Sequence, residues 1–353
     1  MAKTIEDVIK DKFGDILFGG ESITSSKSII IPVSPSIDMM LGGGIPEGSL
    51  VIVTGLQKLG KTSLCLHFAG NAQDIKYRND MCPKEGRHVY FLNVEGRIKP
   101  RDLLGIKHLN IDEKRFTVIG SIAGKILTAE DYIEIAEKLI NERPGSIFIL
   151  DSFSALCTEE EYASEIGKKR RDNTPILLAR FCRRIANILP VNKSIFMGVT
   201  HLMANQGPGM ATWTEASGQK LQYQVDVKLK AKYRQPWKVG ENQIGQDVYW
   251  ECDSSAIGPP GRKAKSKLRY GYGLDCEAEL IDFAVDLGLI EKKASWYVFE
   301  DEKAQGLENL RNILLEKPDK IIELNKKVRE MMGVSKYKQP KTEQVEIDEN
   351  NQS

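Results

Sequence analysis

Apolar runs of strand length alternate with helical segments along most of the chain. The runs are LVIVTG at 50–55, HVYFLNVEG at 88–96, SIFILDSFSAL at 146–156 and KSIFMGVTH at 193–201. Between and around these runs, the sequence predicts helices over 61–73, 128–142 and 175–189. Parallel strands are continuously apolar because helices cover both faces of their sheet. We therefore predict an α/β fold with a doubly wound, mostly parallel sheet over residues 28–270.

The two ends of the chain have a different pattern of apolar and polar residues. Residues 3–18 predict a short amphipathic helix, which the polar stretch GGESITSSKS at 19–28 separates from the core. A helix at 275–288, the strand SWYVF and helices near 306–333 predict a smaller C-terminal unit. The predicted organisation is a segment at 1–27, a core at 28–270, a small α/β domain at 271–335 and a disordered polar tail at 336–353.

Composition narrows the class of protein. Of the 353 residues 41% are hydrophobic, enough for a large core, and 50 Lys and Arg oppose 49 Asp and Glu. Any affinity for nucleic acid must therefore come from local basic clusters. The N-terminus does not resemble a signal peptide, and no apolar run approaches the ~20 residues that span a bilayer. The six cysteines form no CxxC pair, so we expect reduced thiols in a cytoplasmic protein without a membrane partner.

The segment GLQKLGKT matches the phosphate-binding pattern G-x-x-x-x-G-K-[ST] between a buried strand and a helix. Backbone N–H groups of such a loop, together with the positive end of the helix, can surround a phosphate. Lys61 can then reach the β- and γ-phosphates, and the Thr62 hydroxyl can ligate magnesium. The structural alternative is a chance glycine turn. We predict a site for ATP and Mg²⁺ that includes Gly55, Leu56, Gln57, Lys58, Leu59, Gly60, Lys61, Thr62 and Ser63.

Two carboxylates follow other predicted strands. Within the run at 146–156, the predicted apolar strand ends in Asp151, where an NTPase holds its magnesium shell, so Thr62 and Asp151 are the candidate metal residues. Glu95 ends the run at 88–96 and can polarise an attacking water. Alternatively, Asp151 caps a turn and Glu95 only marks a strand exit.

From about residue 30 to 335, the order of motifs resembles the RecA-type homologous recombinases, and the phage UvsX recombinases in particular. The segments that carry the resemblance are SPSIDMMLGGGIPEGSLVIVTG, ILDSFSALCTEEEYASEIG and GYGLDCEAELIDFAVDLGLIEKKASWYVF. The last segment resembles the small C-terminal domain of bacterial RecA, which separates a recombinase from other P-loop proteins. The resemblance implies a RecA-type P-loop NTPase core.

The resemblance also implies roles for individual residues. It makes Glu95 the water-activating carboxylate and Asp151 the magnesium-shell acid, with Lys61 completing the catalytic set. It places His201, in FMGVTH, where the family has a polar residue that senses the γ-phosphate. The structural alternative for His201 is a hydrogen bond within the core at a strand end.

Two segments resemble the DNA-gripping loops of this family. The first, GKKRRDNTP at 167–175, is basic, and the second, LMANQGPGMATWTEASG at 202–218, places large apolar groups among turn-forming residues. Such groups suit insertion between bases, whereas a charge run alone can be a solvated face. The candidate DNA-binding residues are Lys168, Lys169, Arg170, Arg171, Arg180, Arg183, Met203, Met210, Trp213 and Gly218. The cluster GRKAKSK at 261–267 is either a second DNA path or an exposed hairpin.

The chain departs from bacterial RecA before the C-terminal domain. Ser254 and Ala256 stand where that family supplies two lysines to the γ-phosphate of the adjacent protomer. The segment CDSSAIGPP instead resembles the cap of archaeal and eukaryotic recombinases, so Asp253 could hold a K⁺ ion, with Pro259 stiffening the cap. Alternatively, Arg262 or Lys263 replaces the lysines, or the segment is a surface turn.

The resemblance implies an ATP-dependent recombinase that forms filaments on single-stranded DNA and pairs it with homologous double-stranded DNA. Its partners would be these DNAs and further copies of the chain, with single-strand-binding and loader proteins as further candidates. The N-terminal helix would grip the neighbouring protomer through Phe13, Ile16, Leu17 and Phe18, unless it packs on its own core. Two alternatives are a RecA-fold replicative helicase and a non-catalytic regulatory paralogue. The expected location is the cytoplasm of a bacterial cell or of a phage-infected host.

Overall fold

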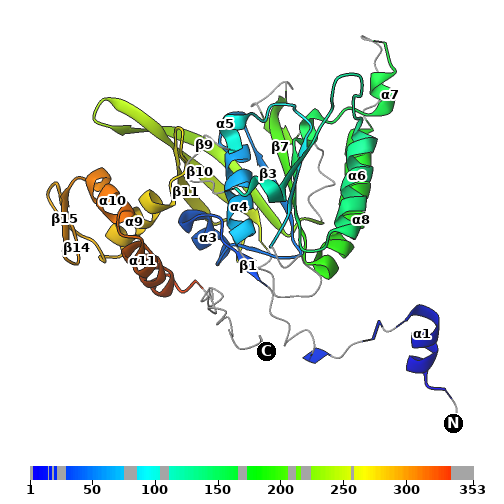
Figure 1. Cartoon of the computed structure of the whole chain (residues 1–353), viewed down its shortest axis with the longest axis horizontal. Helices are drawn as coiled ribbons and strands as arrows, with labels where there is room; N and C mark the ends of the chain where they lie inside the picture. Colours follow the sequence, from blue (N-terminus) through cyan, green and yellow to red (C-terminus); the bar gives the residue numbers. More distant parts are fainter. Residues whose placement is uncertain are drawn as a thin grey trace, which may run out of the picture.

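A mixed sheet forms the centre of the computed structural model (Figure 1). Within the described residues, its strands follow the order β12-β11-β10-β9-β3-β7-β6-β4-β5, and β8 pairs with β7. Pairing is parallel from β9 to β5 and antiparallel from β9 to β12. Their bounds are β3 Leu50–Gly55, β4 Val89–Asn93, β5 Phe116–Ile119, β6 Ile147–Asp151, β7 Ile195–Asn205, β8 Thr212–Glu215, β9 Val227–Val239, β10 Asn242–Ser254, β11 Lys263–Arg269 and β12 Gly273–Leu274. The predicted α/β fold with a mostly parallel sheet is confirmed.

The structure describes residues 3–14, 16–17, 20–21, 29–74, 86–103, 111–165, 173–205, 212–215, 224–255 and 258–334. For residues 101, 203–205 and 212–215, only the backbone is described. The helices are α1 Ile5–Phe13, α3 Pro35–Leu41, α4 Lys61–Asp74, α5 Pro100–Leu103, α6 Ala129–Glu142, α7 Glu159–Tyr162, α8 Thr174–Asn192, α9 Cys276–Asp286, α10 Leu307–Leu315 and α11 Pro318–Met331. A small sheet joins β1 Ile30–Ile31 to β2 Ile45–Pro46, and single 3-10 turns lie at Glu113–Arg115 and Phe153–Ala155.

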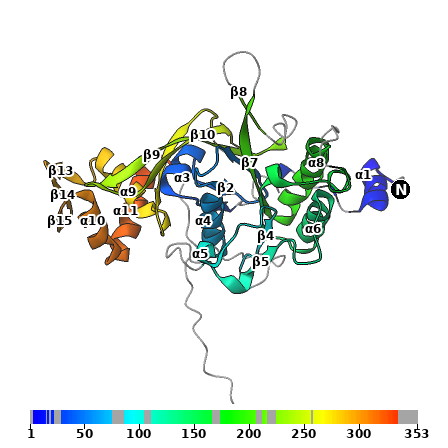
Figure 2. The same cartoon turned by 90° about the horizontal axis from the view of Figure 1, so that it is seen from above.

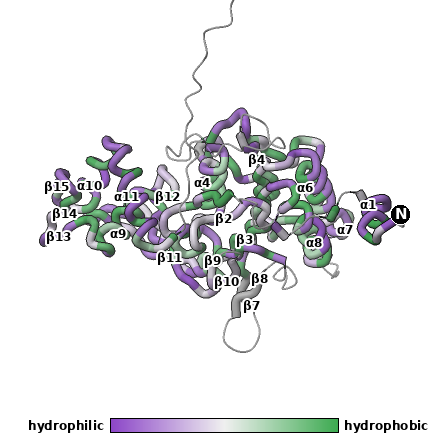
Figure 3. The backbone as a smooth tube through the Cα atoms, turned by 90° about the horizontal axis from the view of Figure 1, so that it is seen from below, coloured by the Kyte–Doolittle hydropathy of each residue, from purple (hydrophilic) through white to green (hydrophobic). Residues whose placement is uncertain are grey.

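Alternate side chains of the central strands lie on opposite faces of the sheet, and both faces are buried. In β3, Val51 and Val53 belong to the cluster that contains α4, whereas Leu50 and Ile52 belong to the cluster that contains α6 and α8. None of these four side chains is more than 2% exposed. Strand residues point alternately to the two faces of a sheet, so each face receives its own layer of helices. Figure 3 shows hydrophilic as well as hydrophobic positions on α6 and α8, as expected for helices with one buried face.

A long hairpin extends the sheet on the side of β3 that lacks β7. Strands β9 and β10 each contain 13 residues. The apolar-run pattern did not predict them, because the outer half of β9, residues 232–236, is exposed and mostly polar. A second projection is made by β7 and β8, which leave the core together (Figure 2).

The C-terminal unit contains the antiparallel strands β13 Glu291–Lys293, β14 Trp296–Phe299 and β15 Glu302–Gln305. These strands and α9, α10 and α11 share a buried cluster that also includes Met39 of α3. Helix α9 begins one residue later than predicted because Asp275 is its N-cap and accepts a hydrogen bond from the backbone N–H of Ala278.

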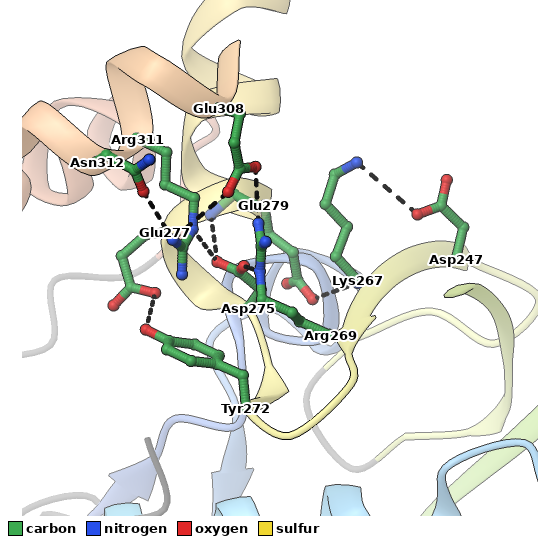
Figure 4. Close-up of polar contacts among 11 residues, drawn as sticks. Asp247, Lys267, Arg269, Tyr272, Asp275, Glu277, Glu279, Glu308, Arg311 and Asn312 are labelled. Atoms are coloured by element: carbon green, nitrogen blue, oxygen red, sulfur yellow. Dashed lines mark hydrogen bonds and ion pairs between the residues drawn. The ribbon is translucent and has the colours of Figure 1, made fainter. Parts of the chain in front are cut away.

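A buried ion cluster attaches this unit to the core (Figure 4). Asp275, which is fully buried, accepts hydrogen bonds from Arg269 of β11 and, at 2.8 Å, from Arg311 of α10. Arg269 also donates to Glu308 at 2.8 Å. Glu279 accepts from the backbone N–H groups of Ser36 at 2.9 Å and Lys267 at 3.0 Å. Both polar contacts and apolar packing thus join the C-terminal unit to the core.

Helix α1 is shorter than the predicted helix. It ends at Phe13 because Gly14 adopts a left-handed backbone with φ of 82°. No residue of α1 is buried, and Phe13, Ile16 and Leu17 are 59%, 54% and 41% exposed, while Phe18 lies outside the described residues. In the part of the chain that the structure describes, no helix has the length and apolar character needed to cross a membrane.

Candidate functional site

The phosphate-binding loop lies at the carboxyl end of β3, and α4 begins within it at Lys61. Gly55 has a φ of 149°, and a Cβ there would lie 2.6 Å from the carbonyl oxygen of Ala231. Gly60 has a φ of 75°, which residues with a side chain rarely adopt. Glycine is therefore required at both ends of the turn that leads into α4. The first N–H groups of a helix have no acceptor within the helix, so those at the start of α4 can bind an anion at the loop.

Lys61 is held inside the loop. Its Nζ donates to the carbonyl oxygens of Gly55 at 2.9 Å and Leu56 at 2.7 Å, and the residue is only 4% exposed. Burial lowers the pKa of this ammonium to about 8, although the nearby carboxylates of Asp151 and Glu95 oppose the shift. The loop therefore holds a cation that needs an anionic partner to remain protonated at alkaline pH.

Thr62 of α4 meets Asp151, the last residue of β6, at the same edge of the sheet. The Thr62 hydroxyl donates to Oδ2 of Asp151 at 2.6 Å. Burial raises the pKa of Asp151, and the Thr62 hydrogen bond partly opposes this. A hydroxyl and a carboxylate are the hard oxygen donors that magnesium takes, usually with waters and substrate phosphates as its other ligands. These two residues therefore fit a Mg²⁺ site completed by nucleotide.

Glu95 lies on the other side of the same space, two residues beyond β4. Its Oε1 accepts from the Ser152 hydroxyl at 2.7 Å and lies 2.9 Å from Nε2 of His201, while its Oε2 pairs with Arg97 at 3.2 Å. The hydrogen bond from His201 is the largest reason that the pKa of Glu95 falls to about 2. Glu95 is thus a carboxylate with partners on both oxygens.

Strand register explains how these distant residues meet. Gly55 of β3 lies opposite His201 of β7, and Asn93 of β4 lies opposite Asp151 of β6. Because parallel strands end at one edge, their carboxyl ends form a common crevice. The crevice is a pocket of about 440 Å³ lined by Gln57, Lys58, Leu59, Gly60, Lys61, Thr62, Ser63, Leu66, Phe91, Asn93, Glu95, Arg97, Ile98, Asp102, Asp151 and His201.

Sequence reasoning missed two groups at this site. Arg97 and Asp102 line the pocket although no motif contains them. Arg234 of β9 and Gln246 of β10 each donate to the carbonyl oxygen of Lys58 at 3.3 Å, and Arg234 also donates to the Gln246 side chain at 2.8 Å. Among these missed residues, the sequence could have indicated only Arg97, because its positive charge lies two residues after Glu95. The Arg234–Gln246 pair depends on the pairing of β9 with β10.

The candidate DNA-binding residues are only partly described. Lys168, Lys169, Arg170, Arg171, Met210 and Gly218 lie outside the described residues. Met203 and Trp213 have a described backbone in the β7–β8 ladder, where Met203 lies opposite Thr214 and Trp213 opposite Ala204. Arg180 and Arg183 are exposed on α8, while the neighbouring Arg184 pairs with Glu137 at 2.9 Å.

The segment before the C-terminal unit lies away from the pocket. Asp253 and Pro259 do not line the pocket of their own protomer, and Oδ2 of Asp253 lies 3.7 Å from Nζ of Lys228. The basic cluster at 261–267 is partly neutralised, because Lys265 and Lys267 each pair with Asp247 and Asp282. Residues 263–267 of this cluster belong to β11, which pairs antiparallel with β10, and Arg262, Lys263 and Lys265 are exposed there.

The sheet and the phosphate loop together define a P-loop nucleotide-binding core. The family model of the RecA N-terminal domain matches residues 2–275, and the model of the RecA C-terminal domain matches residues 278–333. The chain therefore belongs to the RecA family.

Curated relatives cover nearly the whole chain. The proteins named Protein RecA from Streptomyces rimosus and Nocardioides sp. are each 28% identical over 324 residues, which cover 91% of this chain and 81% and 87% of the relatives. Protein RecA from Mycolicibacterium smegmatis is 28% identical, covering 91% of this chain and 88% of its own. With the two family matches, these relatives identify a RecA-type recombinase and do not favour a replicative helicase or a regulatory paralogue.

Proposed function

We propose that this RecA-family protein binds and hydrolyses ATP, assembles into filaments on single-stranded DNA and exchanges strands with homologous double-stranded DNA. The observation that supports this most strongly is the convergence of Lys61, Thr62, Asp151, Glu95 and His201 on one pocket at the carboxyl edge of the sheet. RecA membership supports DNA-dependent ATP hydrolysis in general.

Each pocket residue has a role in the proposed hydrolysis. The loop N–H groups and Lys61 bind and orient the phosphates. Thr62 and Asp151 would hold Mg²⁺, which supplies positive charge to the phosphate oxygens when bound. Glu95 takes the proton of the attacking water, and His201 orients the Glu95 carboxylate through the 2.9 Å contact. We further propose that His201 senses the γ-phosphate, because a phosphate would compete with Glu95 for its Nε2 proton.

DNA binding is assigned to the basic segment at 168–171, to Arg180 and Arg183, and to the β7–β8 projection. The described parts of both regions follow strands that end at the carboxyl edge of the sheet: β7 passes through His201 before it reaches β8, and α8 comes after β6, which ends at Asp151. A γ-phosphate contact at His201 can therefore change the DNA-facing part of the same strand. This continuity supports coupling between nucleotide state and DNA binding.

The remaining assignments complete the proposal. Asp253 is a candidate ligand for K⁺ at the nucleotide of a neighbouring protomer, and Pro259 belongs to the same cap. Nζ of Lys228 lies 3.7 Å from Oδ2 of Asp253, so K⁺ would have to displace this ammonium. Phe13, Ile16, Leu17 and Phe18 are candidate contacts to that neighbour, and the first three have exposed side chains. Single-strand-binding and loader proteins are candidate partners, and a protein that acts on DNA in a bacterial or phage-infected cell would work in the cytoplasm.

The test is ATP turnover with and without single-stranded DNA, on samples that are also examined for filaments by electron microscopy. We expect DNA to stimulate phosphate release and filaments to form with ATP. Lys61→Ala should lose turnover because it removes the cation that the loop directs at the phosphates. Closed rings would favour a helicase, and the absence of turnover with DNA would overturn the ATPase assignment.

A further inference from the structure

Arg97 is a cation beside the candidate base. It follows Glu95 after one residue, Gly96, which has a left-handed φ of 64° and donates its N–H to the carbonyl oxygen of Asn93 at 3.3 Å. This turn folds the chain back, so that Nη1 of Arg97 lies 3.2 Å from Oε2 of Glu95. Arg97 therefore enters the pocket from the same side as Glu95.

The two members of this ion pair differ in their freedom to move. The Arg97 side chain is 77% exposed, whereas the Glu95 side chain is 14% exposed and its other oxygen is held by Ser152 and His201. Because the Arg97 side chain is largely in water, solvent screens this ion pair and it contributes little to stability. A phosphoryl group offers more negative charge and can accept two N–H groups of a guanidinium. Arg97 can therefore exchange Glu95 for phosphate at little cost.

The other basic residues that line the described pocket are differently placed. Lys61 is tied to the carbonyl oxygens of Gly55 and Leu56, and Lys58 lies in the loop whose carbonyl Arg234 and Gln246 hold. The γ-phosphoryl group must lie between the loop and the water that Glu95 activates. Of these three cations, Arg97 alone contacts the base that faces this position.

We propose that Arg97 is a catalytic residue, which leaves Glu95 when ATP binds and contacts the γ-phosphoryl group during hydrolysis. This proposal rests on the proposed ATPase function. The water oxygen bonds to the γ-phosphorus while the bond to the β–γ bridging oxygen breaks, and Glu95 takes the water proton. ADP and phosphate leave, and Arg97 offsets the charge that the transferring group carries in the transition state.

The same movement prepares the base. In the resting arrangement, Glu95 is a weak base because His201, Ser152 and Arg97 all stabilise its anionic form. When the guanidinium moves to the phosphate, Oε2 becomes available to the water. One displacement thus supplies charge to the phosphoryl group and frees an oxygen of the base.

The experiment compares Arg97→Ala and Arg97→Lys with Lys99→Ala, which removes an exposed cation two residues away that does not line the pocket. The first measurement is affinity for ADP alone and for ADP with aluminium fluoride and Mg²⁺, which mimics the transferring phosphoryl group. We expect Arg97→Ala to bind ADP within about twofold of the parent but to bind the mimic about tenfold or more weakly.

The second measurement is DNA-stimulated ATP turnover. In Arg97→Ala, kcat should fall on the order of 10²-fold while KM changes by less than about threefold. Arg97→Lys should recover part of kcat, and Lys99→Ala should match the parent.

Three results would overturn the proposal. Parent-like or faster turnover in Arg97→Ala would make Arg97 only a resting partner that masks Glu95. An equal loss of affinity for ADP and for the mimic would make it an ordinary binding residue. A parent protein without ATP turnover would overturn the proposed function and this proposal together, whereas an active parent with an unaffected Arg97→Ala overturns the role of Arg97 alone.

Discussion

Nε2 of His201 lies 2.9 Å from Oε1 of Glu95, although 106 positions separate the two residues in the chain. The contact exists because β7 and β4 end at the same edge of the sheet, with β6 between them. It joins the strand that continues toward the β7–β8 projection to the candidate base of the nucleotide pocket.

Glu95→Gln tests the role of the base separately from nucleotide binding. Glutamine keeps the size of the side chain and can still accept a hydrogen bond, but it cannot take a proton from water. We expect ATP affinity within about threefold of the parent and a decrease in kcat of at least about 10²-fold. Nucleotide titration and phosphate release on one sample check both expectations, and parent-like hydrolysis would exclude Glu95 as the base.

Lys61 predicts a pH dependence of nucleotide affinity. Its pKa is lowered by burial to about 8 in the nucleotide-free protein, so the ammonium loses its proton as pH rises through this value. Because the charged form attracts phosphate, ATP affinity should fall above pH 8, by up to about tenfold per pH unit. Calorimetric titration at pH 9 in two buffers of different ionisation enthalpy should also detect proton uptake on binding.

Lys61→Arg is the matched control for this pH dependence, since a guanidinium stays protonated over the whole range. Its ATP affinity, even if weaker, should not change between pH 7 and 9.5. An equally steep decline in Lys61→Arg would assign the effect to another group.

Arg234 and Gln246 are predicted to position the loop through the carbonyl of Lys58, which has a left-handed φ of 60°. Removing either donor should raise KM for ATP by about 2–10-fold, the equivalent of one hydrogen bond, with little change in kcat. Because both side chains also bind each other, the double variant should cost less than the sum of the single variants. Lys238→Ala, an exposed cation on the same strand, is the control.

Asp275 is predicted to be the main polar attachment of the C-terminal unit. Asp275→Ala leaves Arg311, which is 5% exposed, and Arg269 without this counterion and should destabilise the protein by about 3–5 kcal/mol. Asp275→Asn can keep the N-cap bond to Ala278 and isolates the effect of the charge. Urea unfolding measures both variants.

An exposed pair provides the comparison for Asp275. Lys293 and Glu291 are 2.8 Å apart with 71% and 57% exposed side chains, so Lys293→Ala should change stability by less than about 0.5 kcal/mol. If Asp275→Asn unfolds at the same urea concentration as the parent, the buried charge is not what holds the unit in place.

The basic segment at 168–171 makes a prediction about salt. Replacing Lys168, Lys169, Arg170 and Arg171 with Ala should weaken single-strand binding and reduce the salt slope of log affinity, by about 0.7 for each phosphate that the variant no longer neutralises. Trp213→Ala should weaken binding with little change of slope, because stacking on a base releases no counterions. Fluorescence titrations over a series of salt concentrations measure both quantities, and an unchanged slope in the fourfold variant would reject the proposed phosphate binding.

The sequence predicted the central strands, α4, α6 and α8, and placed Lys61, Thr62, Asp151, Glu95 and His201 at strand or helix ends. The positions of those residues could be predicted because each comes after a buried apolar run. Parallel strands bring the ends of such runs to one edge of the sheet. Arg97 could not be predicted as a partner of Glu95, since their contact depends on the turn at Gly96.

Other features depend on pairings that local patterns do not contain. Arg234 reaches Lys58 across 176 positions, and its strand continues beyond the core, where both faces are exposed and no apolar run marks it. The contact of Arg311 with Asp275 likewise depends on how α10 packs beside α9. Charged residues on exposed strands and helices carry little positional information until their neighbours are known.

Strand exchange between a circular single strand and a homologous linear duplex tests the proposed recombinase most directly. With ATP and Mg²⁺, the parent protein should convert the two substrates to joint molecules and then to exchanged products, while Lys61→Ala should yield neither and a non-homologous duplex should not react. Filament formation and ATP turnover without any homologous joint molecules would contradict a recombinase and leave only a DNA-dependent ATPase.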